Sequence, residues 1–192
     1  MEYTDKTPKF HLKIIVCGSG AVGKTSIIRR YIHDKFEFNY LMTIGMDPSN
    51  RLVEINNDLL VNLVIFDVAG QERFQMLRDI FFRKANGALL VFDLTRPETL
   101  DDLYEWKQQI DDRLGKDRIP NILIGNKSDL EDLIRIDYQT LEDNVLSDFK
   151  SIKYLETSAY LDHNIREAFT LITEKILINQ GILIKEKSSE ND

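Results

Sequence analysis

The pattern of hydrophobic and polar positions changes its period several times along the chain. Residues 10–17 alternate at first and then end in four consecutive apolar positions, which predicts a strand buried on both faces. After a glycine-containing loop, apolar residues recur at helical spacing, at Ile27, Ile28, Tyr31 and Ile32. Residues 33–49 show no clear period and contain Gly45 and Pro48, so we expect an exposed loop there.

Short apolar runs and helical stripes alternate through the rest of the chain. Residues 51–55 and 59–66 are strand-like, and the Asn-Asn-Asp sequence between them favours an antiparallel hairpin. Further strands are predicted at residues 88–92, 122–124 and 154–155. Two helical stripes accompany them, at Leu100, Leu103, Ile110 and Leu114 and at Ile165, Ala168, Phe169, Ile172 and Ile176. Strands that alternate with helices over short connections indicate an α/β fold with a doubly wound sheet.

Length and composition fit a single globular domain. The 192 residues are 43% hydrophobic and 30% charged, as is typical of a globular chain with a normal core. No repeat or linker divides the chain, so we expect one domain at residues 10–180, a flexible N-terminus at 1–9 and a polar C-terminal tail at 181–192. The net charge of −7 argues against a nucleic-acid binder, which would show a basic stripe.

The cysteine content and the chain ends bear on the compartment. Cys17 is the only cysteine, so no disulfide can form within the chain, and a reducing compartment is expected. No apolar run approaches the roughly 18 residues that span a membrane. Glu2 excludes N-myristoylation, and the C-terminal residues include no cysteine for prenylation. We expect a cytoplasmic protein that acts as a monomer, and we expect any recruitment to membranes to depend on partners.

A phosphate-binding motif lies where the first strand passes into the first helix. It consists of Gly18, Ser19, Gly20, Ala21, Val22, Gly23, Lys24 and Thr25. The glycines let successive main-chain N–H groups point at phosphates, beside the positive end of the helix dipole. Lys24 is expected to reach the β- and γ-phosphates, and the Thr25 hydroxyl is expected to ligate Mg²⁺, which prefers oxygen. The motif predicts the P-loop NTPase fold, with a mostly parallel six-stranded sheet, one antiparallel hairpin strand and helices on both faces.

A second motif, Asn126-Lys127-Ser128-Asp129, follows the strand at residues 122–124, at the strand end where open α/β sheets bind ligands. The Asp129 carboxylate can accept N–H bonds from N1 and the 2-amino group of guanine. Adenine lacks the amino group and presents an acceptor at N1, and a carboxylate left unpaired in a dry site discriminates by a factor on the order of 10⁴ or more. Asn126 can brace this loop, and the stem of Lys127 can lie along the base.

These motifs, in this order, resemble the Ras superfamily of small GTPases over nearly the whole chain. Asp67-Val68-Ala69-Gly70-Gln71-Glu72 is similar to the Asp-x-x-Gly switch motif of that family. The resemblance implies that Asp67 holds Mg²⁺ through a water, that the Gly70 N–H meets the γ-phosphate and that Gln71 orients the attacking water. It also implies that Thr43 binds Mg²⁺ and senses the γ-phosphate.

The same resemblance supplies the remaining nucleotide contacts. Phe36 matches the aromatic residue that flanks the guanine, and Glu156-Thr157-Ser158-Ala159 resembles the last guanine loop, in which the Ala159 N–H reaches the guanine oxygen. The predicted nucleotide-binding set is completed by Ser26, Tyr40 and Ser158. The predicted catalytic residues are Lys24 and Gln71, with Mg²⁺ as the cofactor.

The chain is most similar to the Rab branch, because Gln71-Glu72-Arg73-Phe74 and Thr43-Ile44-Gly45 are typical of it. Rab proteins usually end in prenylated cysteines, so either the natural end is missing here or the chain belongs to an unlipidated lineage. Pro48 replaces the usual aromatic after switch I, which changes the expected effector surface. The family implies GTP and GDP as ligands, and an exchange factor, a GTPase-activating protein and effectors that bind residues 34–48 and 68–80.

The segment before Thr43 contains no arginine, whereas Arg29 and Arg30 lie on the preceding helix. We therefore expect slow intrinsic hydrolysis, about 10⁻⁴ to 10⁻³ per second by family analogy, and acceleration by a partner's arginine. Two alternatives remain open: a GTP-binding scaffold with little hydrolysis, and a phosphoryl-transfer kinase that uses the same loop. The catalytic and metal residues count against the scaffold, and the guanine motif counts against the kinase.

Overall fold

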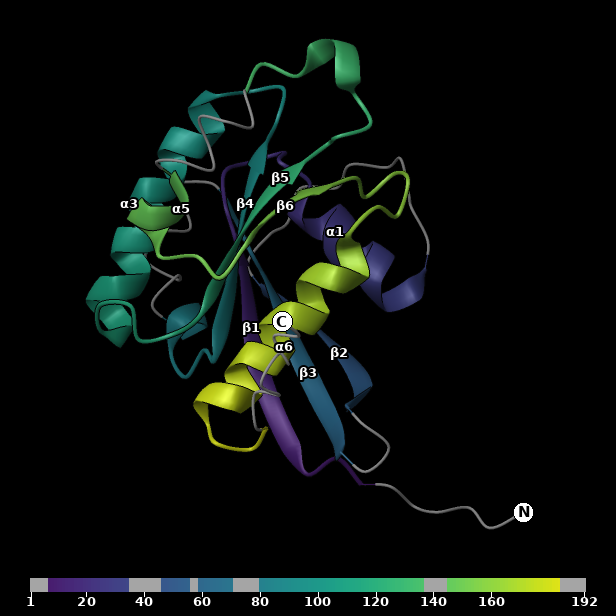
Figure 1. Ribbon diagram of the computed structural model, residues 1–192, viewed down its shortest axis with the longest axis vertical. Helices are drawn as coiled ribbons and strands as arrows, with labels where there is room; N and C mark the ends of the chain where they lie inside the picture. Colours follow the sequence, from purple (N-terminus) through teal and green to yellow (C-terminus); the bar gives the residue numbers. More distant parts are fainter. Residues whose placement is uncertain (1–6, 35–45, 56–58, 71–79, 137–144, 184–192) are drawn as a thin grey trace, which may run out of the picture.

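A computed structural model of the chain describes residues 7–34, 46–55, 59–70, 80–136 and 145–183, and these residues form a mixed sheet of six strands in the order β2-β3-β1-β4-β5-β6 (Figure 1). The strands are β1 (Phe10–Cys17), β2 (Met46–Ile55), β3 (Leu59–Val68), β4 (Gly87–Asp93), β5 (Asn121–Asn126) and β6 (Tyr154–Thr157). β2 runs antiparallel to β3, and every other neighbouring pair is parallel. This arrangement confirms the fold that the sequence predicts.

Helices cover both faces of the sheet. The described helices are α1 (Lys24–His33), α3 (Glu98–Leu114), α5 (Leu146–Phe149), α6 (Ile165–Asn179) and the short 3₁₀ helix η2 (Glu131–Leu133). In Figure 1, α1 and α6 lie on one face, and α3 and α5 lie on the other. Within the described segments, no helix combines the length and the apolar character that crossing a membrane requires.

β1 separates two hydrophobic cores, because successive side chains of a strand point to opposite faces. Leu12, Ile14 and Val16 belong to the core that contains residues of α1 and α6. Ile15 and Cys17 belong to the core that contains residues of α3. The strand is therefore buried on both faces, as its apolar run predicts, and Cys17 is a core residue.

The structure corrects the expected loop at residues 33–49, because β2 already begins at Met46. Its register pairs Met46 with Val68 and Pro48 with Phe66. Proline lacks the N–H that a central strand needs, so Pro48 is a loop signal in the sequence. β2 is an edge strand, however, and an edge strand tolerates proline because one of its sides makes no ladder. The antiparallel pairing with β3 is confirmed, whereas the predicted turn at 56–58 lies outside the described residues.

The contact between α1 and α6 provides a test of the first core. The rings of Tyr31 and Phe169 stack with centroids 3.9 Å apart, and Phe169 is fully buried. We expect Phe169→Ala to lower the free energy of unfolding by about 3–5 kcal/mol, because it removes the stack and leaves a cavity. Urea denaturation at fixed nucleotide and Mg²⁺ concentrations measures this change. Leu52→Ala, at a position 58% exposed on β2, is the control and should change stability by no more than about 0.5 kcal/mol.

Candidate functional site

The carboxyl ends of the parallel strands meet along one edge of the sheet, and the predicted site residues lie there. The phosphate-binding motif follows β1, and Asp67 lies near the end of β3. Asn126 ends β5, and Ser158 and Ala159 follow β6. Segments that are far apart in the sequence are therefore neighbours at the edge where open α/β sheets bind ligands.

The phosphate loop needs glycine at two positions. Gly18 and Gly23 have positive φ angles of 143° and 101°, where other residues are strained. A Cβ on Gly23 would lie 2.2 Å from Nδ2 of Asn126, and one on Gly18 would lie 2.0 Å from the carbonyl oxygen of Val91. Val91 of β4 and Asn126 at the end of β5 thus leave no room for a side chain at these two positions.

Lys24 extends back across the phosphate loop from the first turn of α1. Its Nζ donates hydrogen bonds to the carbonyl oxygens of Gly18, at 2.9 Å, and Ser19, at 2.7 Å. The residue is only 7% exposed. The ammonium group is therefore held inside the curve of the loop, beside the main-chain amides that the sequence predicts will face phosphate.

The two predicted metal-site residues of the described chain are in contact, because the Thr25 hydroxyl donates a hydrogen bond to the Asp67 carboxylate. Asp67 is buried. Gly70, three residues on, lies against the phosphate loop, and a Cβ there would come within 2.6 Å of the carbonyl oxygen of Gly18. A hydroxyl and a carboxylate side by side offer the hard oxygen ligands that Mg²⁺ prefers, so the donor set fits that ion.

A cavity of about 360 Å³ lies beside the phosphate loop, and Asn126, Lys127, Asp129 and Ala159 of the predicted guanine-binding residues line it. Its lining residues are Gly23, Ser26, Asn126, Lys127, Asp129, Leu130, Ala159 and Tyr160. Asn126 Nδ2 donates to the carbonyl oxygen of Val22 at 2.9 Å, and the Thr157 hydroxyl donates to Asn126 Oδ1 at 3.1 Å. The Ser158 hydroxyl donates to Asp129 Oδ1 at 2.5 Å. The two guanine motifs and the phosphate loop therefore form one connected structure.

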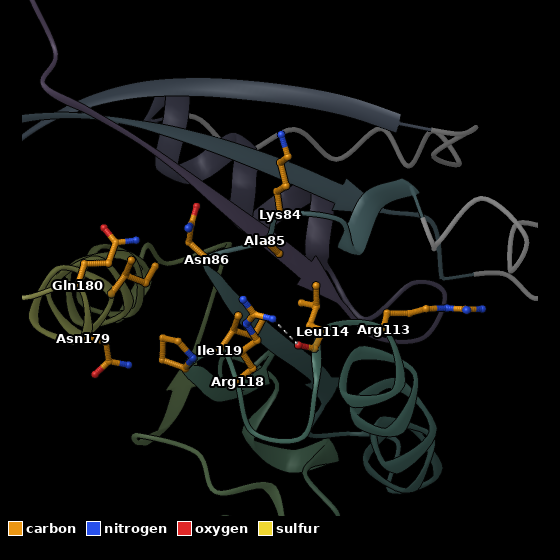
Figure 2. A pocket seen from close by; sticks show the side chains of 11 residues that line it. Lys84, Ala85, Asn86, Arg113, Leu114, Arg118, Ile119, Asn179 and Gln180 are labelled. Carbon is orange, nitrogen blue, oxygen red and sulfur yellow. Dashed lines mark hydrogen bonds between the residues drawn. The ribbon is translucent and has the colours of Figure 1, made fainter.

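A larger cavity, of about 640 Å³, lies at the opposite end of the sheet, before β4 and β5 (Figure 2). Lys84, Arg113 and Arg118 are among its lining residues. It also adjoins the C-terminal ends of α3 and α6, where the helix carbonyls favour cations, and Arg118 Nη1 donates to the carbonyl oxygen of Leu114. None of the predicted site residues lines this cavity, so size alone does not identify the functional site.

Comparison with known proteins agrees with this geometry. The model of the family described as "Ras family" matches residues 13–178. The chain belongs to this family. It is 38% identical over 168 residues to the Ras-related protein Rab-32B of Dictyostelium discoideum, an alignment that covers 86% of this chain and 64% of that protein. It is 35% identical to human Ras-related protein Rab-32 over 97% of this chain and 83% of that protein. The GTP-binding protein yptV5 of Volvox carteri is 38% identical, over 88% of this chain and 83% of that protein.

The chain is thus a Rab-like small GTPase, and most of the residues predicted for nucleotide and metal come together at the strand ends. The structure brings the phosphate loop, Thr25, Asp67 and Gly70 to one side of the site. It brings Asn126-Lys127-Ser128-Asp129 and the Ser158-Ala159 loop to the other. Four predicted residues lie outside the described segments: Phe36, Tyr40, Thr43 and Gln71.

The structure of this Rab-like GTPase gives Arg30 a contact that the sequence does not reveal. Arg30 Nε donates to the carbonyl oxygen of Ala159 and Nη2 to that of Tyr160, both at 2.9 Å. The planar guanidinium can bind two acceptors at once, so this side chain ties α1 to the last guanine loop. Arginine on a surface helix carries no sequence signal for such a contact, because its partners are main-chain carbonyls 129 and 130 positions away.

A second contact that sequence reasoning missed is centred on Asp93, at the carboxyl end of β4. Its side chain is fully buried and accepts hydrogen bonds from Lys127 and Arg96 and from both the N–H and the hydroxyl of Thr95. Burial alone would raise the pKa of this carboxyl, but these hydrogen bonds outweigh burial and hold the pKa below its usual value. The sequence does contain a signal for Asp93, because a polar residue that ends a buried parallel strand lies at the edge of the sheet where ligands bind.

The guanine contact predicted for Asp129 can be tested with a base that lacks one donor. Inosine has no 2-amino group, so we expect the wild-type protein to bind GDP roughly tenfold or more tighter than IDP. Asp129→Ala should weaken GDP binding and bring the two dissociation constants close together. Competition against a fluorescent guanine nucleotide measures both constants. Asp132→Ala, at an exposed carboxylate three positions further on, is the control and should retain the preference for GDP.

Proposed function

We propose that this Rab-like GTPase binds GTP and GDP with Mg²⁺ at the strand-end site and changes its partners between the two nucleotide states. The observation that carries the proposal is the direct connection of the phosphate loop to the guanine motif through Asn126 and Val22. That connection sets a fixed separation between a site for phosphate and a site for a purine. A ligand that contains both groups, a guanine nucleotide, fits it best.

The phosphate end binds by charge and by main-chain donors. α1 begins at Lys24, within the phosphate-binding motif, so its N-terminal N–H groups and its dipole favour an anion there. The ammonium of Lys24, which now donates to loop carbonyls, can donate to phosphate oxygens at the same place. Because these groups are already held by the fold, little reorganisation is needed when the nucleotide binds.

We assign Mg²⁺ to Thr25 and Asp67, with Thr43 as a further ligand predicted from the family. When bound, the ion neutralises the charge that develops on the β- and γ-phosphate oxygens. Asp67 is predicted to act through a water, and its burial keeps the carboxylate fixed toward Thr25. Gly70 is predicted to meet the γ-phosphate through its N–H, and the lack of a side chain lets its backbone lie against the phosphate loop.

The water that attacks the γ-phosphate is oriented by Gln71. The segment before Thr43 contains no arginine that could assist. Loss of the γ-phosphate releases the contacts of Thr43 and Gly70, and residues 34–48 and 68–80 are the surfaces that exchange factors, activating proteins and effectors would read. The Rab-named relatives suggest a role in membrane traffic, with recruitment to membranes through partners. Nothing in the described residues favours a scaffold without hydrolysis.

The hydrolytic role has a direct kinetic test. Single-turnover hydrolysis of GTP by the purified protein should proceed at about 10⁻⁴ to 10⁻³ per second, because the sequence before Thr43 supplies no arginine to neutralise the transition state. Gln71→Leu should slow it by roughly tenfold or more, since the leucine side chain cannot orient water. Gln108→Leu, on an exposed position of α3, should leave the rate unchanged. A rate of Gln71→Leu equal to that of the wild type would contradict the assigned role.

The metal assignment predicts how nucleotide release responds to chelation. Removing Mg²⁺ with EDTA should accelerate the release of fluorescent GDP by roughly tenfold or more, because a ligand shared by protein and phosphate is lost. Excess Mg²⁺ should restore the slow rate. Thr25→Ala should release GDP quickly already in Mg²⁺ and respond weakly to EDTA. Equal responses of Thr25→Ala and wild type would exclude Thr25 as a ligand.

A further inference from the structure

The phosphate loop and the guanine motif are connected a second time, through charged side chains of the β4–α3 segment. Arg96 Nη2 donates to the carbonyl oxygen of Gly20, in the phosphate loop, at 3.1 Å. Arg96 Nε donates to Asp93 Oδ2 at 2.9 Å. Lys127 Nζ donates to the same carboxylate oxygen at 2.6 Å. A continuous path of polar contacts therefore runs from Gly20 through Arg96 and Asp93 to Lys127.

Burial makes the two cations of this path depend on one another. The Asp93 side chain is 0% exposed, whereas those of Arg96 and Lys127 are 37% and 31% exposed. Thr95 occupies the other carboxylate oxygen, so both cations share Oδ2. Removing one cation leaves a buried carboxylate with less compensation, so the energetic effect of removing the second cation depends on whether the first is present. A change at either end of the path is therefore felt at the other.

The geometry also explains why arginine serves at position 96. Its rigid, planar guanidinium presents Nε to the carboxylate and Nη2 to the Gly20 carbonyl at the same time. A lysine at this position could compensate the charge of Asp93, but its ammonium lacks the fixed spacing between Nε and Nη2 that reaches the two acceptors here. The contact with the phosphate loop thus depends on the shape of the side chain as well as on its charge.

We propose that Arg96 and Asp93 are positioning residues that couple the grip on the guanine to the grip on the phosphates. Asp93 fixes the Lys127 stem along the base, and Arg96 fixes the phosphate loop at Gly20. Breaking this relay (Gly20, Arg96, Asp93 and Lys127) loosens both loops together and speeds the release of nucleotide. The inference rests on the proposed function, since it requires a guanine nucleotide at this site.

A second hydrogen bond from a side chain of the phosphate loop offers a matched control. The hydroxyl of Ser19, next to Gly20, donates to Asp102 Oδ2 on α3 at 2.5 Å. Asp102 is on the surface, and the hydrogen bond that it accepts from Ser19 involves neither Asp93 nor Lys127. Asp102→Asn therefore disturbs the phosphate loop one residue away without entering the relay.

The experiment measures the dissociation rate of fluorescent GDP from the full chain in Mg²⁺, for single and double variants. Arg96→Gln should accelerate release by about tenfold, because it removes a charged hydrogen bond from each end of the guanidinium. Arg96→Lys should recover only part of the wild-type rate. Arg96→Gln and Lys127→Met both act through Asp93. The double variant should therefore release GDP at a rate at least about threefold lower than the product of the two single rate increases predicts. Asp102→Asn with Lys127→Met should instead give the product.

Several results would overturn the relay. Release from Arg96→Gln within twofold of the wild type would do so, and so would single effects that simply multiply in the double variant. A lowered thermal midpoint of Arg96→Gln with an unchanged release rate would reduce Arg96 to a structural role. If Arg96→Gln does not fold, Arg96→Lys with Lys127→Met provides the same cycle. A wild-type protein that takes up no guanine nucleotide would refute the proposed function itself, whereas binding by the wild type with unaffected variants would refute the relay alone.

Discussion

The hydrogen bond from the Asn126 side chain to the carbonyl oxygen of Val22 joins positions 104 residues apart and connects the two halves of the site directly. The other end of the amide accepts the Thr157 hydroxyl, so three loops converge on one buried side chain. Gly23 makes room for it, since any Cβ there would collide with the amide nitrogen. The distance between the phosphate region and the purine region follows from this packing.

The site assembles positive charge in a chain whose net charge is −7. Four cations that the structure describes there are held by oxygen atoms of the protein. Loop carbonyls hold Lys24, Asp93 holds Lys127 and Arg96, and the carbonyls of the last guanine loop hold Arg30. Such contacts orient the side chains before a ligand arrives. They explain how an acidic protein can favour a polyanionic nucleotide at this edge of its sheet.

The chain's relationship to the Ras family and the geometry of the site reinforce each other for a physical reason. The motifs are short and separated by long stretches of sequence, and they are useful only if the parallel strands bring their carboxyl ends together. The register of β1 with β3 and β4, and of β5 with β4 and β6, does this. The close approach of the segment after β3 to the phosphate loop also depends on Gly70, since its backbone fits against that loop only without a side chain.

The sequence by itself determined the α/β class, the antiparallel hairpin and the phosphate and guanine motifs, because each depends on local periodicity or on a short run of residues. It misplaced the start of β2, because Pro48 reads as a loop signal and only the sheet shows that this strand lies at an edge. It did not reveal the partners of Arg30, Arg96 or Asp93. Those contacts join loops that meet only in the folded sheet, and a charged side chain carries no sign in the sequence of which distant oxygen it will bind.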